Sequence, residues 1–494
     1  MKKGMMHEYK KKFASDVIFY GISSGLISLF GLITLPILTK TLSPDLYGVW
    51  VQIGVTIGLL LTFITLGFQM TVVRFLSGNE DKQRVSSLFH LMLGIVLLNG
   101  LLFVLITFFF QKVLSSFIFA DVSFHHFVPL TGLWLMAQAI YAMHISFIRS
   151  RSKIKLLSLI NIGLSTLHIL ILYMVLIVFT GNIEMVLILY ILATVILSVI
   201  IYLFEVVRTV GIYVKVHDVK STLKDLFKFS LPFIPNLPLG WILASSDRYF
   251  IVHLLSLSEN AVYSVAYSLA NVLSLFYMPL GFVAYPLLVE FWEKNQKSAV
   301  RDIFEKSSRV YIFFVIPSIF GLYVIGPKLI LILATSDYIV PSTLILWVCL
   351  GILFLGFEQI NVYIIHLTKK TYYTTFIISI AAVLNIVLNY FFIKAIGIEG
   401  AAISTFISYL FLATFVAFLA RKELHYSFDI KFTLKCIFAS LIMLFVIRQV
   451  AISSIFMMLL SILLGAGIYL ALTIFLRCFT KEDIKDIKHI FGFD

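Results

Sequence analysis

Residues 185–204 read MVLILYILATVILSVIIYLF, a run that contains no Asp, Glu, Lys or Arg. A helix needs about 20 mainly apolar residues to cross the ~30 Å hydrocarbon core of a bilayer, so this segment is long enough to span one. Comparable runs recur along the 494 residues, of which 61% are hydrophobic and 13% charged. The runs are continuous, whereas barrel strands alternate with a period of two. The sequence therefore predicts an all-α polytopic membrane protein.

The apolar runs predict about 14 transmembrane helices, as two sets of six and a final pair. The first set is expected near 15–37, 46–73, 86–110, 126–148, 156–179 and 184–204. The second is expected near 229–246, 259–289, 310–333, 340–366, 372–393 and 398–420, and the pair near 432–449 and 453–476. We therefore predict an N-terminal six-helix lobe at 1–206, a cytoplasmic linker at 207–228, a C-terminal six-helix lobe at 229–425, and appended helices with a cytoplasmic tail at 426–494.

Positive charge lies mostly on one side of these spans. The connections that share a side with the amino terminus carry about 32 of the 38 Lys and Arg residues, against 6 for the other side. Because cytoplasmic loops are enriched in Lys and Arg, both termini are expected in the cytoplasm. The same bias accounts for the net charge of +13 through topology and anionic lipid contacts, so no nucleic acid partner is expected.

The two predicted lobes contain similar segments. Residues 42–50 read LSPDLYGVW and residues 255–263 read LSLSENAVY, and each is followed about twenty residues later by Leu-Gly-Phe, at 66–68 and 280–282. Each segment opens an even-numbered span, as a parallel repeat of six helices requires. Halves of this kind meet around an axis along the membrane normal, with the substrate site between them.

Motifs of common enzymes are missing from the sequence. It has no P-loop, no His-Glu-x-x-His and no Gly-x-Ser-x-Gly, so we expect no enzyme and no catalytic residue. The cysteines, Cys349, Cys436 and Cys478, are widely spaced, which predicts neither a metal site nor a disulfide framework. No cofactor is expected beyond a possible coupling ion, H⁺ or Na⁺.

Polar residues inside or beside spans are costly there and are the candidates for function. Arg74 follows Gln69 at the cytoplasmic end of the second span, where a guanidinium can grip a phosphate head group; the alternative is an ordinary positive-inside anchor. Asp247-Arg248-Tyr249 lies at the outer end of the seventh span. Arg248 could receive an anion there, with Asp247 holding it, or the two could form a local ion pair.

Three further residues stand alone within predicted spans. Glu358, in the cytoplasmic half of the tenth span, could bind H⁺ or Na⁺ for coupling, or pair with a neighbouring polar group. His144 and His168 are interpreted as satisfied packing histidines rather than proton relays.

Prolines interrupt the start of the seventh span. Pro232, Pro235 and Pro238 each remove a backbone hydrogen bond, so this helix is expected to bend or break, and Asn236 among them is a candidate substrate contact. The matching part of the first lobe, residues 21–31, is rich in Gly and Ser. Interrupted helices at corresponding positions of two halves indicate a transport path.

At these segments the chain resembles the polysaccharide-transporter, or oligosaccharide-flippase, branch of the multidrug/oligosaccharidyl-lipid/polysaccharide exporter superfamily. The similarity rests on segments in the family's order: TLSPDLYG at 41–48, KFSLP at 228–232, DRY at 247–249, AVYS at 261–264 and GIEGAAIS at 397–404. It runs over nearly the whole chain. Fourteen spans also suit this branch better than the drug-exporting branch, which usually has twelve.

The resemblance implies a flippase of undecaprenyl-pyrophosphate-linked oligosaccharide repeat units in the bacterial cytoplasmic membrane, serving O-antigen (lipopolysaccharide), capsule or exopolysaccharide synthesis. Two lobes would alternate between inward and outward openings, and a polysaccharide polymerase and chain-length machinery are the implied partners. Few Lys or Arg lie clearly inside spans, which fits a charged head group poorly. The alternatives are a cation-coupled exporter of small amphipathic molecules, a peptidoglycan lipid-precursor flippase, and an enzyme acting on the same lipid-linked sugars.

Overall fold

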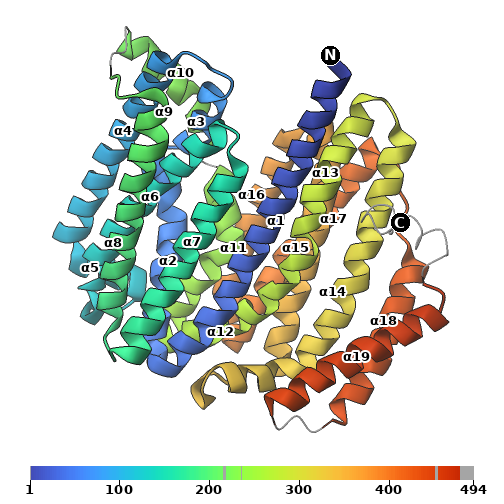
Figure 1. Ribbon diagram of the computed structural model, residues 1–494. Helices are drawn as coiled ribbons and strands as arrows, with labels where there is room; N and C mark the ends of the chain where they lie inside the picture. The colour runs from blue at the N-terminus through green and yellow to red at the C-terminus, as the bar shows by residue number, and fades with distance from the viewer. Residues whose placement is uncertain (1, 215–217, 235, 451–453, 479–494) are drawn as a thin grey trace. The chain divides into compact units, whose positions relative to one another are not determined.

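A computed structural model describes residues 2–214, 218–234, 236–450 and 454–478. Within these ranges the chain is helical and contains no strand, which confirms the predicted all-α polytopic membrane fold (Figure 1). Twelve of the described helices are long and apolar enough to cross a membrane. The predicted seventh and eighth spans are not among these twelve. They correspond to α11 (Asn236–Leu254) and to α12 (Leu257–Ala270) followed by α13 (Met278–Glu293).

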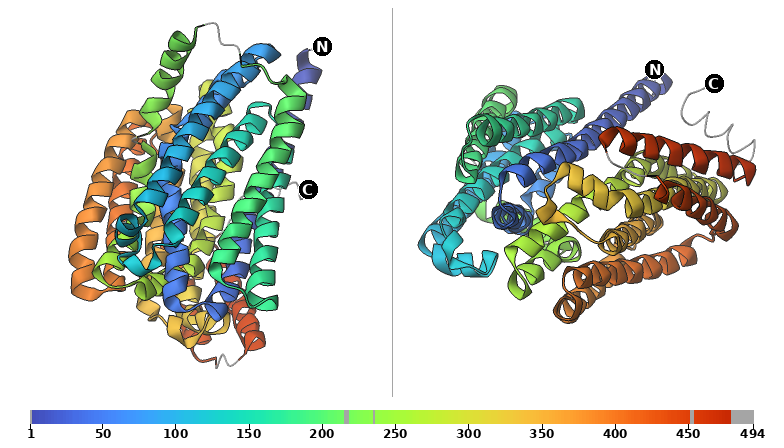
Figure 2. Two further views of the ribbon diagram at one scale, coloured as in Figure 1. Left: turned by 90° about the vertical axis from the view of Figure 1, so that its left-hand side faces the viewer. Right: turned by 90° about the horizontal axis from the view of Figure 1, so that it is seen from below.

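The first of two compact units comprises residues 1–264 and 382–401. Its remaining helices are α1 (Lys2–Thr41), α2 (Pro44–Thr65), α3 (Phe68–Leu76), α4 (Lys82–Phe109), α5 (Gln111–Phe119), α6 (Phe127–Ser150), α7 (Ile154–Tyr173), α8 (Ile183–Ile201), α9 (Arg208–Val210), α10 (Val219–Ser230) and the end of α16 (Thr371–Ile396). Within the unit α4 packs on α6 and α6 on α8, and these three helices run side by side in both views of Figure 2.

The second unit comprises residues 265–381 and 402–494. It contains α13, α14 (Lys297–Leu333), α15 (Ser342–Leu367), most of α17 (Ile398–Glu423), α18 (Ile430–Arg448) and α19 (Ile455–Phe475). Here α14 packs on α15 and α18, and α18 packs on α19. The predicted lobes at 1–206 and 229–425, with their linker and appended pair, stay a prediction.

Two predicted spans are broken where the sequence suggested continuous helices. The second span divides into α2 and α3, because Leu66 and Gly67 adopt φ angles of 52° and 72°. A side chain at Gly67 would also meet the Ser230 carbonyl oxygen at 2.9 Å. The eighth span is divided by a 3₁₀ segment at Asn271–Phe276. The sequence does not indicate a boundary between two short helices when the residues on both sides of it are equally apolar.

The two similar segments begin their helices in the same way. The Ser43 hydroxyl oxygen accepts a hydrogen bond from the Leu46 N–H at 3.4 Å, and the Ser256 hydroxyl oxygen accepts one from the Glu259 N–H at 3.1 Å. A serine cap satisfies a backbone N–H that the first turn leaves unpaired. Both α2 and α12 therefore start directly after an N-capping serine, at equivalent positions of the two segments.

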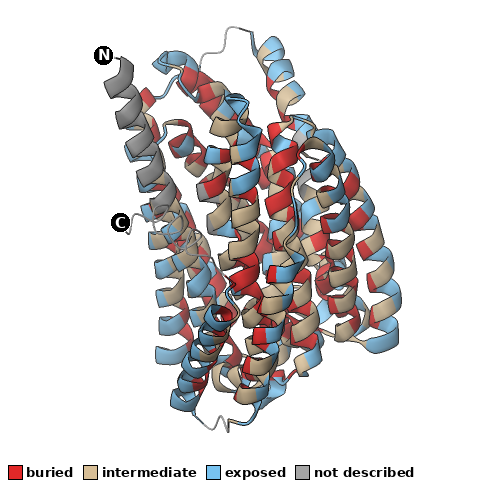
Figure 3. Ribbon diagram, turned by 90° about the vertical axis from the view of Figure 1, so that its right-hand side faces the viewer, coloured by how far each residue is buried: buried red, intermediate tan, exposed pale blue. Residues whose placement is uncertain are grey.

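Many helices carry large apolar side chains on exposed faces, and Figure 3 shows exposed and buried residues alternating along them. Leu463, Ile474 and Phe475 of α19 are 69–83% exposed. Soluble proteins rarely expose apolar surface on this scale. Lipid covers such faces in a membrane, so this pattern agrees with a multi-pass membrane protein.

Candidate functional site

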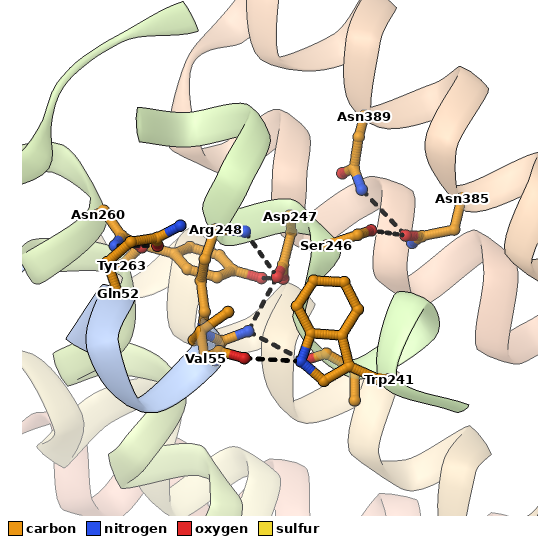
Figure 4. Close-up of polar contacts among 11 residues, drawn as sticks. Gln52, Val55, Trp241, Ser246, Asp247, Arg248, Asn260, Tyr263, Asn385 and Asn389 are labelled. Carbon is orange, nitrogen blue, oxygen red and sulfur yellow. Dashed lines mark hydrogen bonds and ion pairs between the residues drawn. The ribbon is translucent and has the colours of Figure 1, made fainter. Parts of the chain in front are cut away.

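Asp247 and Arg248 form a buried ion pair on α11. Arg248 Nη1 lies 2.8 Å from Asp247 Oδ1 and donates a second hydrogen bond, of 2.9 Å, to the Ala244 carbonyl (Figure 4). The Tyr263 hydroxyl of α12 donates to Asp247 Oδ2 at 2.5 Å, and its ring centroid lies 5.5 Å from the guanidinium carbon. The carboxylate thus has a donor on each oxygen, and the structure contains the local ion pair that the sequence offered as one of two interpretations.

A second set of contacts joins α2 to α11 and α12. The Asn260 side-chain amide donates to Gln52 Oε1 at 3.4 Å, the Trp241 indole N–H donates to the Val55 carbonyl at 3.0 Å, and the hydroxyls of Thr56 and Tyr249 lie 2.7 Å apart. We call this set the α2 seam. Figure 4 shows the first two of these contacts beside the ion pair.

A small residue allows the helices of the α2 seam to meet. A Cβ atom added at Gly48 would lie 2.2 Å from the Leu257 carbonyl oxygen. Small residues let the backbones of membrane helices approach closely, and hydrogen bonds between side chains then hold them. The seam therefore combines close backbone approach with polar contacts.

Asparagines of α16 lie on the other side of α11 and complete what we call the polar cluster, which comprises the Asp247–Arg248 pair, Tyr263, the α2 seam, Ser246, Asn385 and Asn389. The Ser246 hydroxyl donates to Asn385 Oδ1 at 3.0 Å, and the Asn389 amide donates to the same oxygen at 3.0 Å (Figure 4). Asn385 Nδ2 and Asn389 Oδ1 are buried and have no hydrogen-bond partner. Buried polar groups without a partner are unusual in proteins, so this end of the cluster retains capacity to bind a water or a polar ligand.

The remaining candidate substrate contacts lie elsewhere in the first unit. Arg74 and Gln69 belong to α3, after the break at Leu66 and Gly67, where α3 packs on α10 through the Phe68–Phe227 ring contact. Arg74 is exposed and Gln69 half-buried, whereas Arg248 is buried. Asn236 begins α11, and its side chain lies outside the described residues.

Glu358 is buried on α15 of the second unit, with 3% of its surface exposed. The amide of the neighbouring Gln359 donates to its Oε2 at 2.8 Å. One turn away, Asn361 donates to the Phe357 carbonyl and accepts a hydrogen bond from the Tyr426 hydroxyl. No group of three or more His, Cys, Asp and Glu side chains that could hold a metal ion occurs within the described ranges.

The two intramembrane histidines have different surroundings. His168 is half-buried and stacks on Tyr190, with ring centroids 3.9 Å apart, but its Nε2 has no hydrogen-bond partner. His144 is buried, and neither of its ring nitrogens has a hydrogen-bond partner. The interpretation of both histidines as satisfied packing residues is therefore wrong.

Sequence reasoning did not select several members of the polar cluster. These are Gln52, Trp241, Ser246, Asn260, Tyr263, Asn385 and Asn389. A signal existed for some of them, because Asn385 and Asn389 lie four residues apart within an apolar run and so share one helix face. Without the fold, no pattern indicates that this face meets the Asp247 helix.

Apolar helices of membrane-spanning length that enclose an ion pair and amide groups define a multi-pass membrane protein with a polar interior. The chain matches the family described as "Polysaccharide biosynthesis protein" over residues 13–292, more than half of its length. It belongs to that family, and the resemblance noted from the sequence is confirmed.

Relatives and solved structures extend the comparison. The chain is 27% identical over 210 residues to an uncharacterized membrane protein of Methanocaldococcus jannaschii, covering 42% of this chain and 41% of that protein. It is 21% identical over 271 residues to the "probable low-salt glycan biosynthesis flippase Agl15" of Haloferax volcanii, covering 53% of this chain and 57% of that protein. The chain thus spans about half the length of these curated relatives.

Two solved structures share the fold over most of their length. Lipid II flippase MurJ in an inward closed conformation aligns with 93% of this chain and 99% of its own, with a TM-score of 0.74 and 19% identity. An inward-facing multidrug resistance transporter of the MATE family aligns with 81% of this chain and 94% of its own, with a TM-score of 0.67 and 13% identity. At these identities the similarity describes the fold.

Proposed function

We propose that this chain is a flippase, which moves a lipid-linked oligosaccharide across the membrane. Membership of a polysaccharide biosynthesis family supports a sugar-containing substrate. The fold shared with a lipid II flippase and a multidrug transporter supports transport rather than catalysis. A charged sugar-phosphate head group needs such a protein because it cannot cross about 30 Å of hydrocarbon unaided.

One observation carries the proposal: the Asp247–Arg248 pair is buried among apolar helices, on α11, which the family match at residues 13–292 covers. Charged residues within membrane helices are rare and mark substrate or ion pathways. Asp247 and Arg248 are 1% and 8% exposed, and their partners come from α11 and α12. We propose that sugar hydroxyls or the phosphate bind near this cluster, with Asp247, Arg248 and Tyr249 among the contacts.

An apolar cavity in the second unit suits the lipid part of such a substrate. It measures about 360 Å³ and is lined by α14, α18, α19 and the 3₁₀ segment before α13. None of its described lining residues is charged, and the Tyr469 hydroxyl on its wall already donates to the Phe313 carbonyl at 2.8 Å. A hydrocarbon chain therefore fits this cavity better than a sugar does.

The resemblance seen in the sequence suggests a more specific substrate and membrane. The substrate is an oligosaccharide repeat unit on undecaprenyl pyrophosphate, and the membrane is the bacterial cytoplasmic membrane with both termini inside. Arg74, exposed on α3, contacts the phosphate on the cytoplasmic side, and Gln69 and Asn236 contribute polar contacts. The lobes alternate between inward and outward openings, and the product passes to a polymerase and chain-length machinery.

Glu358 is the proposed coupling site. A carboxylate that is 3% exposed within a membrane helix is poorly solvated. Binding a proton or Na⁺ neutralises its charge and is therefore favoured. The side chain that donates a hydrogen bond to it, Gln359, is neutral. Export driven by an ion gradient would follow from loading this group on one side and unloading it on the other.

The test is translocation in proteoliposomes that contain the purified full chain. Three fluorescent substrates are offered separately: an oligosaccharide on undecaprenyl pyrophosphate, lipid II, and a cationic amphipathic dye. Access of each substrate to an impermeant quencher is followed with time. We expect the undecaprenyl-linked oligosaccharide to change sides, and protein-free liposomes to show the background rate.

The other outcomes have distinct meanings. Transport of lipid II alone would make the protein a peptidoglycan precursor flippase, and transport of the dye alone would make it a small-molecule exporter. Deletion of the gene in its host provides the second readout. Loss of one surface polysaccharide, with its lipid-linked unit held on the cytoplasmic face, is expected, whereas unchanged polysaccharide would contradict the proposal.

A further inference from the structure

A second cavity lies within the first unit, among α4, α6 and α8, the helices that run side by side in Figure 2. It measures about 530 Å³, within the range of about 300–1,000 Å³ that is typical of small-molecule sites. Leu97, Val195 and Val199 on its wall are also exposed, so the cavity reaches the lipid-facing surface of α4 and α8. A ligand can therefore enter it from the bilayer.

Two histidines line this cavity, and one of them is fully hydrogen-bonded. His90 Nδ1 lies 2.7 Å from the Ser86 carbonyl oxygen, which can only accept, so Nδ1 donates. His90 Nε2 then accepts from the Tyr202 hydroxyl at 3.0 Å. His90 has no remaining hydrogen-bonding capacity for a ligand.

The other histidine has both nitrogens available. His144 is 2% exposed, its ring lies beside Phe89 and Tyr202, and neither nitrogen has a hydrogen-bond partner. Ser198 of α8 lines the same cavity, and its hydroxyl oxygen is likewise buried without a partner. Leaving buried polar atoms unpaired is energetically costly, so a ligand that pairs them is favoured.

The backbone is also irregular at this cavity. Tyr202 begins a π-helical segment, Tyr202–Val207, that continues α8. Such segments are rare and frequently occur at functional sites. The two unpaired side chains and the irregular helix thus coincide at one lipid-accessible cavity.

We propose that this cavity binds a neutral lipid that carries a free hydroxyl group, with the hydroxyl at His144 and Ser198 and the hydrocarbon chain among α4, α6 and α8. A neutral imidazole has one donor and one acceptor nitrogen, which point in different directions, so a lipid hydroxyl would donate to the acceptor nitrogen of His144 and accept from the Ser198 hydroxyl. An ester or ether oxygen only accepts and would leave the imidazole acceptor unpaired. The ligand is thus a long-chain alcohol, an isoprenoid alcohol or a diacylglycerol.

The same lining argues against an anionic head group. No Lys or Arg is found among the described residues that line the cavity. A buried phosphate without a cation partner is strongly disfavoured. The site therefore selects a different molecule from the transported phosphate-linked substrate, and the inference does not depend on the proposed flippase activity.

The test is photolabelling of the purified full chain in lipid nanodiscs. The probe is a 16-carbon alcohol with a diazirine in its chain, and its methyl ether is the matched probe without a free hydroxyl. Labelled peptides are identified by mass spectrometry. We expect the alcohol to label peptides of α4, α6 and α8 about five- to tenfold more strongly than the ether, the ratio that one hydrogen bond provides.

Variants locate the binding site. A Cβ atom at Gly94 meets nothing within 4 Å, so Gly94→Leu fills the cavity without a backbone clash and should abolish labelling. Gly163 on α7 is equally open but does not line the cavity, so Gly163→Leu should label like the parent. His144→Phe keeps the ring volume and should lower labelling by the alcohol to the level of the ether.

Three results would overturn the inference. Equal labelling by alcohol and ether in the parent protein would exclude recognition of the hydroxyl, whatever the variants do. Unchanged labelling of Gly94→Leu would place the probe elsewhere. Competition by undecaprenyl phosphate as strong as by unlabelled hexadecanol would assign the cavity to the anionic lipid carrier instead.

Discussion

Asp247 has a hydrogen-bond donor on each carboxylate oxygen although it is buried among apolar helices. The pair with Arg248 is local, because the two residues are neighbours in sequence, and Tyr263 supplies the contact from α12. A buried ion pair of this kind keeps both charges compensated while the helices are in place. It also makes the cluster sensitive to loss of either member.

We expect Asp247→Ala to destabilise the protein severely. Removing one partner of a buried pair leaves the other charge unpaired, which costs about 3–5 kcal/mol in the free energy of unfolding. The matched control is Lys294→Ala, which breaks the Lys294–Glu290 pair, where the side chains are 55% and 36% exposed. Exposed pairs contribute about 0–1 kcal/mol. Thermal unfolding in detergent measures both, and equal shifts would contradict the buried pair's role.

Arg74 tests the cytoplasmic end of the proposed path. We expect Arg74→Ala to reduce export of the lipid-linked oligosaccharide, and Arg74→Lys to retain more activity because the positive charge remains. Arg74 is exposed, so neither change should alter protein levels. Export is measured as surface polysaccharide, normalised to membrane protein content. Full export by both variants would remove Arg74 from the site.

At the scale of helices, long apolar runs were predictable and their interruptions were not. The run at 185–204 lies within one continuous helical stretch of membrane-spanning length, Ile183–Val210. An apolar segment of this length forms a helix in a bilayer because a helix pairs all of its backbone polar groups internally. The break at Leu66 and Gly67 depends on backbone angles that an apolar sequence does not reveal. Of the candidate site, the Asp247–Arg248 pair could be predicted, since it is local. The α2 seam could not, since its partners lie about 190–210 residues apart.

The α2 seam predicts that Gly48 tolerates no side chain. We expect Gly48→Ala to force α2 away from α12, because the new Cβ atom would lie 2.2 Å from the Leu257 carbonyl oxygen. Overpacking of this kind typically costs about 1–3 kcal/mol. Gly54 on the same helix has nothing within 4 Å of an added Cβ atom, so Gly54→Ala should be neutral or slightly stabilising. Thermal unfolding and export measure the two variants, and equal behaviour would contradict the close approach.

At the scale of the whole molecule, the distribution of charge and hydropathy predicts more about membrane topology than any sequence motif does. The bias of about 32 against 6 basic residues predicts which loops face the cytoplasm, and the similar segments at 42–50 and 255–263 predict a repeat. The identity of the sugar has no such signature, because hydroxyl recognition uses polar residues that every chain contains. Energy coupling is different, since it requires a titratable or ion-binding group within the membrane.

Glu358 is the group on which coupling is expected to depend. We expect Glu358→Gln to transport its substrate at a rate that no longer responds to an imposed H⁺ or Na⁺ gradient, because the amide binds neither ion as the carboxylate does. The gradient is varied across proteoliposomes, and the ratio of rates with and without it is the readout. Glu293→Gln, an exposed change at the end of α13, is the control and should keep the parent's ratio. A Glu358→Gln protein whose transport keeps the full gradient dependence would show that the coupling ion binds elsewhere.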